Sequence, residues 1–163
     1  MKPTLVFILQ ITWFTAVWAT VARFVVWPWA ERLEPHRAVA VWVAPQMFRV
    51  LGLGLLVPNL SPDMPSAFAV PTAIGDSLTA VLALAAFVTL QRGRSAGFRL
   101  AWACTIVGTA DGLHALTLAA RLGVAENLAA QWYVPALGVP LMGVCHVACA
   151  VALLHARSRT HAA

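Results

Sequence analysis

The chain has 163 residues, of which 61% are hydrophobic and only 10% are charged, and its mean hydropathy is +0.80. Because soluble domains carry about 25% charged residues, this composition excludes an ordinary soluble domain and predicts a protein solvated by lipid. The formal net charge of +5 does not indicate nucleic-acid binding, because the arginines lie between apolar runs instead of on one basic face.

The first apolar run predicts a transmembrane helix over about residues 4–27, with Trp27-Pro28-Trp29 at the membrane interface. The run lacks the short apolar core of a signal peptide, so we expect a retained helix. A second apolar run, residues 38–56, contains Pro45 and Arg49. Its 19 residues would just cross a bilayer core of about 30 Å. A re-entrant segment is the alternative.

A proline-rich loop at residues 58–65 precedes the third predicted span, at about residues 70–90. The fourth span is predicted at about 98–120. An amphipathic connection and the interface pair Trp132-Tyr133 then lead into the fifth, at about 133–155. The sequence therefore predicts one all-α domain over residues 1–163. It is either a bundle of five transmembrane helices or four helices plus a re-entrant segment.

The basic residues of the loops predict the orientation of the chain. Five spans place seven Lys and Arg residues on one side and two on the other, whereas four spans give six against three. Because Lys and Arg gather on the cytoplasmic side, we expect five spans, an external N-terminus and a cytoplasmic C-terminus. The seven are Arg32, Arg37, Arg92, Arg94, Arg99, Arg157 and Arg159.

A few ionisable side chains fall inside the predicted spans. Each costs about 2.5 to 3.5 kcal/mol on the insertion scale, so it needs a partner or a purpose. Arg49, Asp111 and His146 come within about a turn of the middle of their spans, and Asp76 and His114 lie slightly toward the outside. We expect these five residues to share one polar layer inside the bundle.

Two interpretations of this layer remain open. In one, Arg49 pairs with Asp76 or Asp111 as a buried structural ion pair. In the other, both carboxylates face Arg49 and leave one acid unneutralised, so that a proton, a cation or a ligand head group completes the site. Three functions follow: a membrane-embedded binding or transport protein, an enzyme that uses Asp or His for proton transfer on a lipid or quinone, and an accessory or structural subunit.

A second group, Met142, Cys145, His146 and Cys149, lies on one face of the fifth span. Thioether, thiolate and imidazole favour soft metals such as Cu(I), although Met and Cys are also ordinary packing residues. His114 and His146 would alternatively supply two axial haem ligands. The sequence indicates no particular cofactor. Its predicted partners are the lipid bilayer and either another membrane protein or a second copy of the chain, and no nucleic acid is expected.

Three stretches carry a resemblance to known sequences: Ala73-Ile74-Gly75-Asp76, Val107-Gly108-Thr109-Ala110-Asp111, and Trp132-Tyr133-Val134-Pro135 followed by His146. Together with Arg49-Val50-Leu51-Gly52 they resemble a group of small bacterial integral membrane proteins of uncharacterised function, over about residues 46–150. The resemblance implies a bacterial inner-membrane location and places Asp76, Asp111 and His146 in the shared pattern. It implies no reaction.

Overall fold

The structure, a computed structural model, describes residues 2–161 and side chains as far as Ser158. Arg159, one of the basic residues expected on the cytoplasmic side, therefore lies outside the described side chains. All regular structure within residues 2–161 is helical, which confirms the all-α prediction. The elements are α1 (Pro3–Val21), η1 (Ala22–Val26), α2 (Trp27–Ala30), α3 (Pro35–Val43), η2 (Ala44–Leu56), α4 (Ser66–Gln91), α5 (Ala96–Leu122), η3 (Val124–Glu126), η4 (Ala129–Gln131) and α6 (Tyr133–His161).

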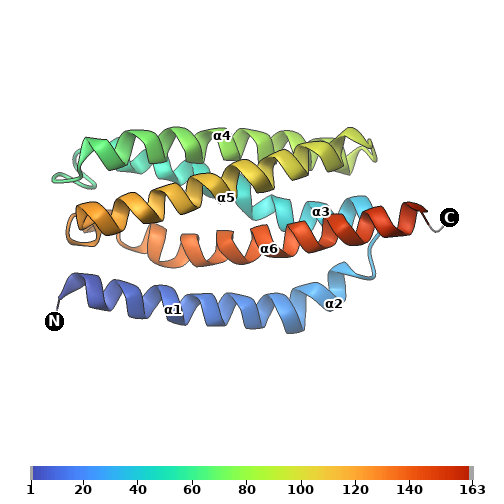
Figure 1. Cartoon of the computed structure of the whole chain (residues 1–163), viewed down its shortest axis with the longest axis horizontal. Coiled ribbons are helices and arrows are strands. Elements are labelled where there is room, and N and C mark those ends of the chain that lie inside the picture. The colour runs from blue at the N-terminus through green and yellow to red at the C-terminus, as the bar shows by residue number, and fades with distance from the viewer. Residues whose placement is uncertain (1, 162–163) are drawn as a thin grey trace.

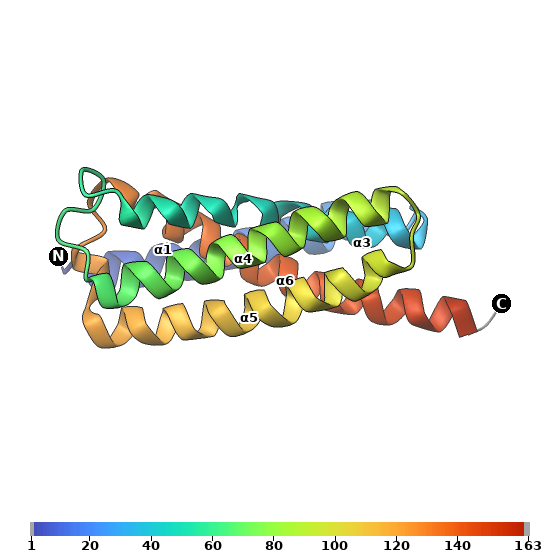
Figure 2. The same cartoon turned by 90° about the horizontal axis from the view of Figure 1, so that it is seen from above.

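Five helical segments of the described chain are long and apolar enough to cross a membrane, judged by length and composition. They run side by side along the long axis of the molecule, and the two ends of the chain lie at opposite ends of the bundle (Figures 1 and 2). Each agrees with a predicted span to within a few residues. The segments are Pro3–Ala30, Pro35–Leu56, Ser66–Gln91, Ala96–Leu122 and Ala129–Ser158.

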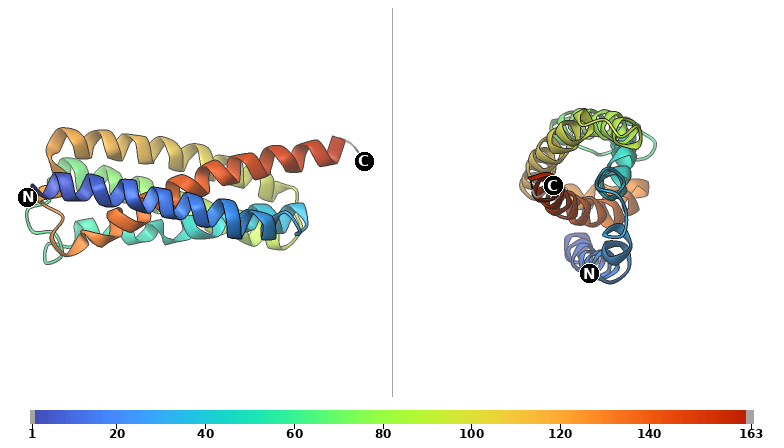
Figure 3. Two further views of the ribbon diagram at one scale, coloured as in Figure 1. Left: turned by 90° about the horizontal axis from the view of Figure 1, so that it is seen from below. Right: turned by 90° about the vertical axis from the view of Figure 1, so that its right-hand side faces the viewer.

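The first helix lies to one side of the other four. Seen end-on, α1 lies at the edge of the bundle, outside the group formed by α3, η2, α4, α5 and α6 (Figure 3). No residue of α1 is buried. Its N-terminal half is fixed at the start of α6, where Trp132 Nε1 donates to Gln10 Oε1 at 2.7 Å and the Trp132 ring meets Phe7 edge-on. The central packing therefore belongs to the four later helices.

The second long segment changes its helical form at the predicted proline. Residues 35–43 are α-helical, and Ala44–Leu56 continues as a 3₁₀ helix with Pro45 in its first turn. Proline has no N–H to donate to the preceding turn, which weakens the α-helical pattern there. Because a 3₁₀ helix rises about 2 Å per residue, the whole segment is roughly 40 Å long, enough to cross a 30 Å core.

The 3₁₀ form aligns the buried residues of η2. With three residues per turn, side chains three positions apart lie directly above one another. The buried residues of η2 are Gln46, Arg49 and Gly52, at that spacing. Large apolar neighbours such as Phe48 and Leu51 are 64% and 56% exposed. A narrow polar stripe therefore faces the bundle, and the rest of η2 is apolar.

Apolar packing closes both ends of the bundle. Near α2 and α3, a large cluster includes Val39, Val43, Leu90 and Leu153, all at most 2% exposed. At the other end, a smaller cluster forms around Phe68, Val124 and Leu128. The loop at residues 57–65 also packs here, because Ala130 donates its backbone N–H to the carbonyl of Leu60. The polar residues of the long helices lie between these two clusters.

Candidate functional site

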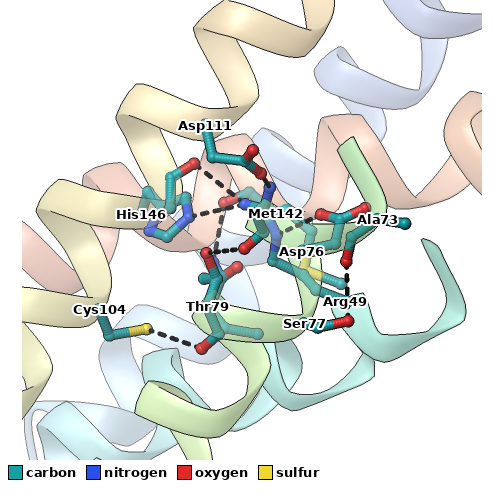
Figure 4. A network of polar contacts seen from close by, with 12 residues as sticks. Arg49, Ala73, Asp76, Ser77, Thr79, Cys104, Asp111, Met142 and His146 are labelled. Atoms are coloured by element: carbon teal, nitrogen blue, oxygen red, sulfur yellow. Dashed lines mark hydrogen bonds and ion pairs between the residues drawn. The ribbon is translucent and has the colours of Figure 1, made fainter. Parts of the chain in front are cut away.

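Arg49 is the centre of a polar network that joins η2, α4, α5 and α6 (Figure 4). Its Nε donates to Asp76 Oδ1 at 2.8 Å and its Nη2 to Asp111 Oδ2 at 2.5 Å. Nη1 donates to the carbonyl oxygen of Gly108 at 3.1 Å and lies 3.3 Å from His146 Nε2. Four of the five guanidinium N–H groups are thus engaged, which holds the side chain in one orientation.

The charges of this network do not cancel. Arg49 supplies one positive charge, whereas the carboxylates of Asp76 and Asp111 supply two negative charges when ionised. The side chains of all three are largely buried, at 8%, 17% and 9% exposed. Neutralising a second carboxylate in such surroundings requires a further positive charge, because isolated buried charges are costly. With both carboxylates ionised, the network carries one negative charge in excess.

Three glycines make room for this network. A Cβ added to Gly52 would collide with the Asp76 carboxylate, and one added to Gly75 would collide with the Asp111 carboxylate. At Gly108 a Cβ would come within 2.6 Å of the His146 ring. Each charged or aromatic group thus lies directly against the backbone of the neighbouring helix, an approach that small residues permit.

The contact with Arg49 determines the tautomer of His146. Arginine has no hydrogen-bond acceptor, so His146 Nε2 must accept from Nη1 and the ring proton of a neutral imidazole lies on Nδ1. Nδ1 is buried and has no hydrogen-bond partner among the described residues. Buried donors rarely stay unpaired, so this N–H is available to a group that the protein itself does not supply.

Three further buried polar atoms around the network also have no partner among the described residues. They are Gln46 Oε1, Thr72 Oγ1 and Gln131 Oε1. Gln46 precedes Arg49 by one 3₁₀ turn, and Thr72 precedes Asp76 by one α-helical turn. The side chain of Gln131 packs against Gly54 of η2. Water or a ligand within the bundle would satisfy these atoms.

Four of the five residues expected in the polar layer are in contact: Arg49, Asp76, Asp111 and His146. The fifth, His114, is exposed on α5 and makes no hydrogen bond to Arg49. Sequence reasoning did not identify Gln46, nor the glycines that face the carboxylates. Gln46, Arg49 and Gly52 follow Pro45 at intervals of three residues, and this spacing could have indicated a 3₁₀ helix with these residues on one face.

The residues of the predicted soft-metal set all lie on α6, and two of them contact η2. His146 directs Nε2 at Arg49, and the carbonyl oxygen of Met142 accepts from Gln46 Nε2 at 3.0 Å. Cys145 and Cys149 are buried free thiols. Within residues 2–161, no group of three or more His, Cys, Asp or Glu side chains is arranged to hold a metal ion. The soft-metal and haem alternatives stay predictions.

Comparison with known proteins identifies a family but no activity. No curated protein and no solved structure matches the chain. A family model described as "Domain of unknown function (DUF8737)" matches residues 6–154, which includes the whole Arg49 network. The chain therefore belongs to the family described as domain of unknown function DUF8737.

Proposed function

We propose that this chain is an integral membrane protein of the bacterial inner membrane, and that its Arg49 site binds a proton or a small cation as part of a binding or transport activity. The five long helices would cross the bilayer, with the N-terminus outside and the C-terminus in the cytoplasm. The site would then lie near the middle of the membrane, enclosed by η2, α4, α5 and α6.

The membrane placement is supported by length and charge. Each of the five segments has at least 22 residues, and together they expose many large apolar side chains, among them Trp13, Phe24, Val81 and Val147 at 65% or more. In water such a surface would drive aggregation, whereas lipid tails solvate it. The loop that joins α4 to α5 contains Arg92 and Arg94, as expected on the cytoplasmic side.

The observation that carries the proposed activity is the pair of carboxylates on one guanidinium. A purely structural ion pair needs one acid, and the second makes the site negative. A proton on either carboxylate, or a small cation beside it, would restore neutrality at low cost in surroundings that disfavour net charge. The unpaired Nδ1 of His146 would offer a further hydrogen bond to a bound water.

The proposal is tested with the purified protein reconstituted in vesicles. After an acid pulse, we expect the wild-type protein to take up more protons than a variant carrying Asp76→Asn and Asp111→Asn, by about one proton per chain. Repeating the pulse with Na⁺ or K⁺ present distinguishes the two ligands, because a bound cation would lower the proton uptake.

Asp63→Asn is the matched control, because Asp63 is an exposed acid in the loop between η2 and α4. It should leave the difference between wild type and double variant unchanged. Equal proton uptake by wild type and the Asp76/Asp111 double variant, with no effect of either cation, would contradict the proposal.

The two alternative functions make different demands on the structure. An enzyme acting on a lipid or quinone needs a lateral opening beside Asp76 and His114. A groove of about 840 Å³ between the first long helix and α6 is lined by neither residue, so it gives this alternative no support. An accessory subunit would co-purify with one partner in near-equal amount, and its proton uptake would not depend on Asp76 or Asp111.

A further inference from the structure

A groove of about 840 Å³ lies between parts of the first long helix and α6, and no residue of the Arg49 network lines it. One wall comes from Ile11, Ala19 and Ala22, and the other from Val139, Gly143 and Val147. The lining is mostly apolar and small, which explains why α1 contains no buried residue although it runs alongside α6. The groove is a place where lipid can reach far into the molecule.

One end of the groove is charged. Arg23 and Glu31 line it, with Trp27 between them in the sequence. Glu31 follows Arg23 by eight residues, about 12 Å along the helix, and its Oε1 accepts from Trp27 Nε1 at 2.8 Å, so it forms no ion pair with Arg23. Arg23 is exposed and makes no ion pair with any residue from 2 to 158; its guanidinium lies 5.7 Å from the Phe24 ring centroid. A cation without an acidic partner therefore marks the mouth of an otherwise apolar groove.

The helix itself is reshaped at this mouth. Residues Ala22–Val26 form a π-helical turn directly before Trp27-Pro28. Pro28 cannot donate an N–H to the preceding turn and crowds its carbonyl oxygen, and a widened turn is a common response that often occurs at functional sites. Arg23 lies within this widened turn, so its side chain is presented at the charged end of the groove.

The dimensions of the groove fit a lipid chain better than a helix. From Arg23 to Ile11 the first helix spans roughly 18 Å, close to the 15 Å hydrocarbon depth of one leaflet. The first long helix and the last one touch toward both ends of the groove, through Gln10 and Trp132 and through Trp27 and His155, so a helix that spans the membrane cannot lie between them along its whole length. The space is therefore suited to a thin, flexible occupant.

We propose that this groove binds an anionic phospholipid, with an acyl chain between α1 and α6 and the phosphate at Arg23. The chain would run from the interface at Trp27 toward Ile11, within a single leaflet. In the orientation proposed above, this is the cytoplasmic leaflet, whose anionic lipids attract basic residues near the surface. The inference rests on the proposed membrane placement and is independent of the Arg49 site.

The test compares lipids retained by the full-length protein after mild detergent extraction, measured by native mass spectrometry. The protein is reconstituted first in equal parts of phosphatidylglycerol and phosphatidylethanolamine. We expect phosphatidylglycerol to be retained preferentially, and Arg23→Gln to lower that preference about fivefold, the effect of one basic residue near a membrane surface. Arg23→Lys should keep most of it.

The apolar part of the site is tested by filling it. A side chain added at Gly143 or Gly138 meets nothing within 4 Å at its Cβ, but only Gly143 lines the groove. Gly143→Phe should therefore abolish lipid retention, and Gly138→Phe should not. Ala19→Phe fills the same groove from the opposite wall and should repeat the result of Gly143→Phe.

Three results would overturn the inference. These are equal retention of both lipids by the wild-type protein, equal retention by Gly143→Phe and Gly138→Phe, and a stable dimer that Gly143→Phe disrupts in the absence of lipid. If the protein were absent from the membrane fraction, the membrane placement itself would fail. Loss of proton uptake at Asp76 and Asp111 would leave the lipid result unaffected.

Discussion

Arg49 connects every charged group of the candidate site, and lysine could not replace it. The guanidinium donates from Nε to Asp76 and from Nη2 to Asp111, two directions set by its planar geometry. An ammonium group is a compact point charge and would satisfy one carboxylate at a time. The site therefore depends on the shape of this cation as well as on its charge.

Removing Arg49 should destabilise the protein, because two buried carboxylates would lose their counter-charge. We expect Arg49→Met to lower the free energy of unfolding by about 3 to 5 kcal/mol, the usual effect of breaking a buried pair and leaving its partner uncompensated. Adding Asp76→Asn and Asp111→Asn to Arg49→Met should recover most of that loss. Denaturant titration in mixed micelles measures both variants, and a triple variant as unstable as Arg49→Met would contradict the account.

The glycines that face the carboxylates give a prediction with an internal control. Gly75→Ala should destabilise the protein by about 1 to 3 kcal/mol, because its Cβ would push Asp111 away from Arg49. Gly112→Ala adds the same methyl group where nothing lies within 4 Å, so it should be neutral or slightly stabilising. Thermal unfolding of the two variants side by side checks this, and equal losses would count against the proposed packing.

The sequence identified the charged residues of the site but not their surroundings. Arg49, Asp76, Asp111 and His146 were visible because ionisable groups are rare and expensive in apolar helices. Which glycine faces which carboxylate depends on how neighbouring helices are rotated, and no sequence pattern records that. His114 was expected in the layer from its depth and its spacing of three residues from Asp111; that spacing rotates it by about 60° from Asp111, and it lies on the exposed face of α5.

Among the elements, η2 was predictable as a helical segment, but its type of helix was not predictable from hydrophobic periodicity. Pro45 and Arg49 marked the segment as irregular, yet its 3₁₀ form could not be predicted because a 3₁₀ helix and an α-helix differ by only about 20° per residue. That difference matters over two turns. In an α-helix, Gln46 and Gly52 would be rotated apart by about 120°, whereas the 3₁₀ helix keeps both in line with Arg49.

The attachment of α1 to the bundle gives an element-scale prediction. Trp132→Phe keeps an aromatic ring against Phe7 but removes the hydrogen bond to Gln10. We expect the free energy of unfolding to fall by about 0.6 to 1 kcal/mol. We also expect less disulfide crosslinking between cysteines placed on α1 and α6. Trp13→Phe is the control, because Trp13 is 69% exposed and should show neither effect. Identical behaviour of the two variants would exclude Trp132 as the anchor.

For the whole molecule, hydropathy was enough to predict five long helices but not their arrangement. An apolar side chain that faces lipid and one that faces another helix look alike in the sequence. Leu84 is 54% exposed and Leu90 is 1% exposed, although both belong to the same apolar stretch of α4. The peripheral position of α1 and the groove beside it follow from packing alone.

A crossing by α4 predicts that the loops before and after it lie on opposite sides of the membrane, whether the whole chain crosses five times or four. In whole cells, a cysteine at Asn59 should react with a membrane-impermeant thiol reagent, and a cysteine at Ser95 should react only after the membrane is opened. The native thiols Cys104, Cys145 and Cys149 are buried and should contribute little labelling. Reaction of both introduced cysteines in intact cells would require an even number of crossings between them.

The bundle encloses one carboxylate more than Arg49 can neutralise. Infrared difference spectroscopy of the reconstituted protein tests it most directly, because a protonated carboxyl group has a carbonyl stretch that a carboxylate lacks. On acidification we expect this band to be stronger in the wild-type protein than in the variant that combines Asp76→Asn and Asp111→Asn, in which only the acids outside the network, Glu31, Glu34, Asp63, Glu126 and the C-terminus, still contribute. A band of equal intensity in both proteins, or in neither over the pH range in which the fold is intact, would contradict the account.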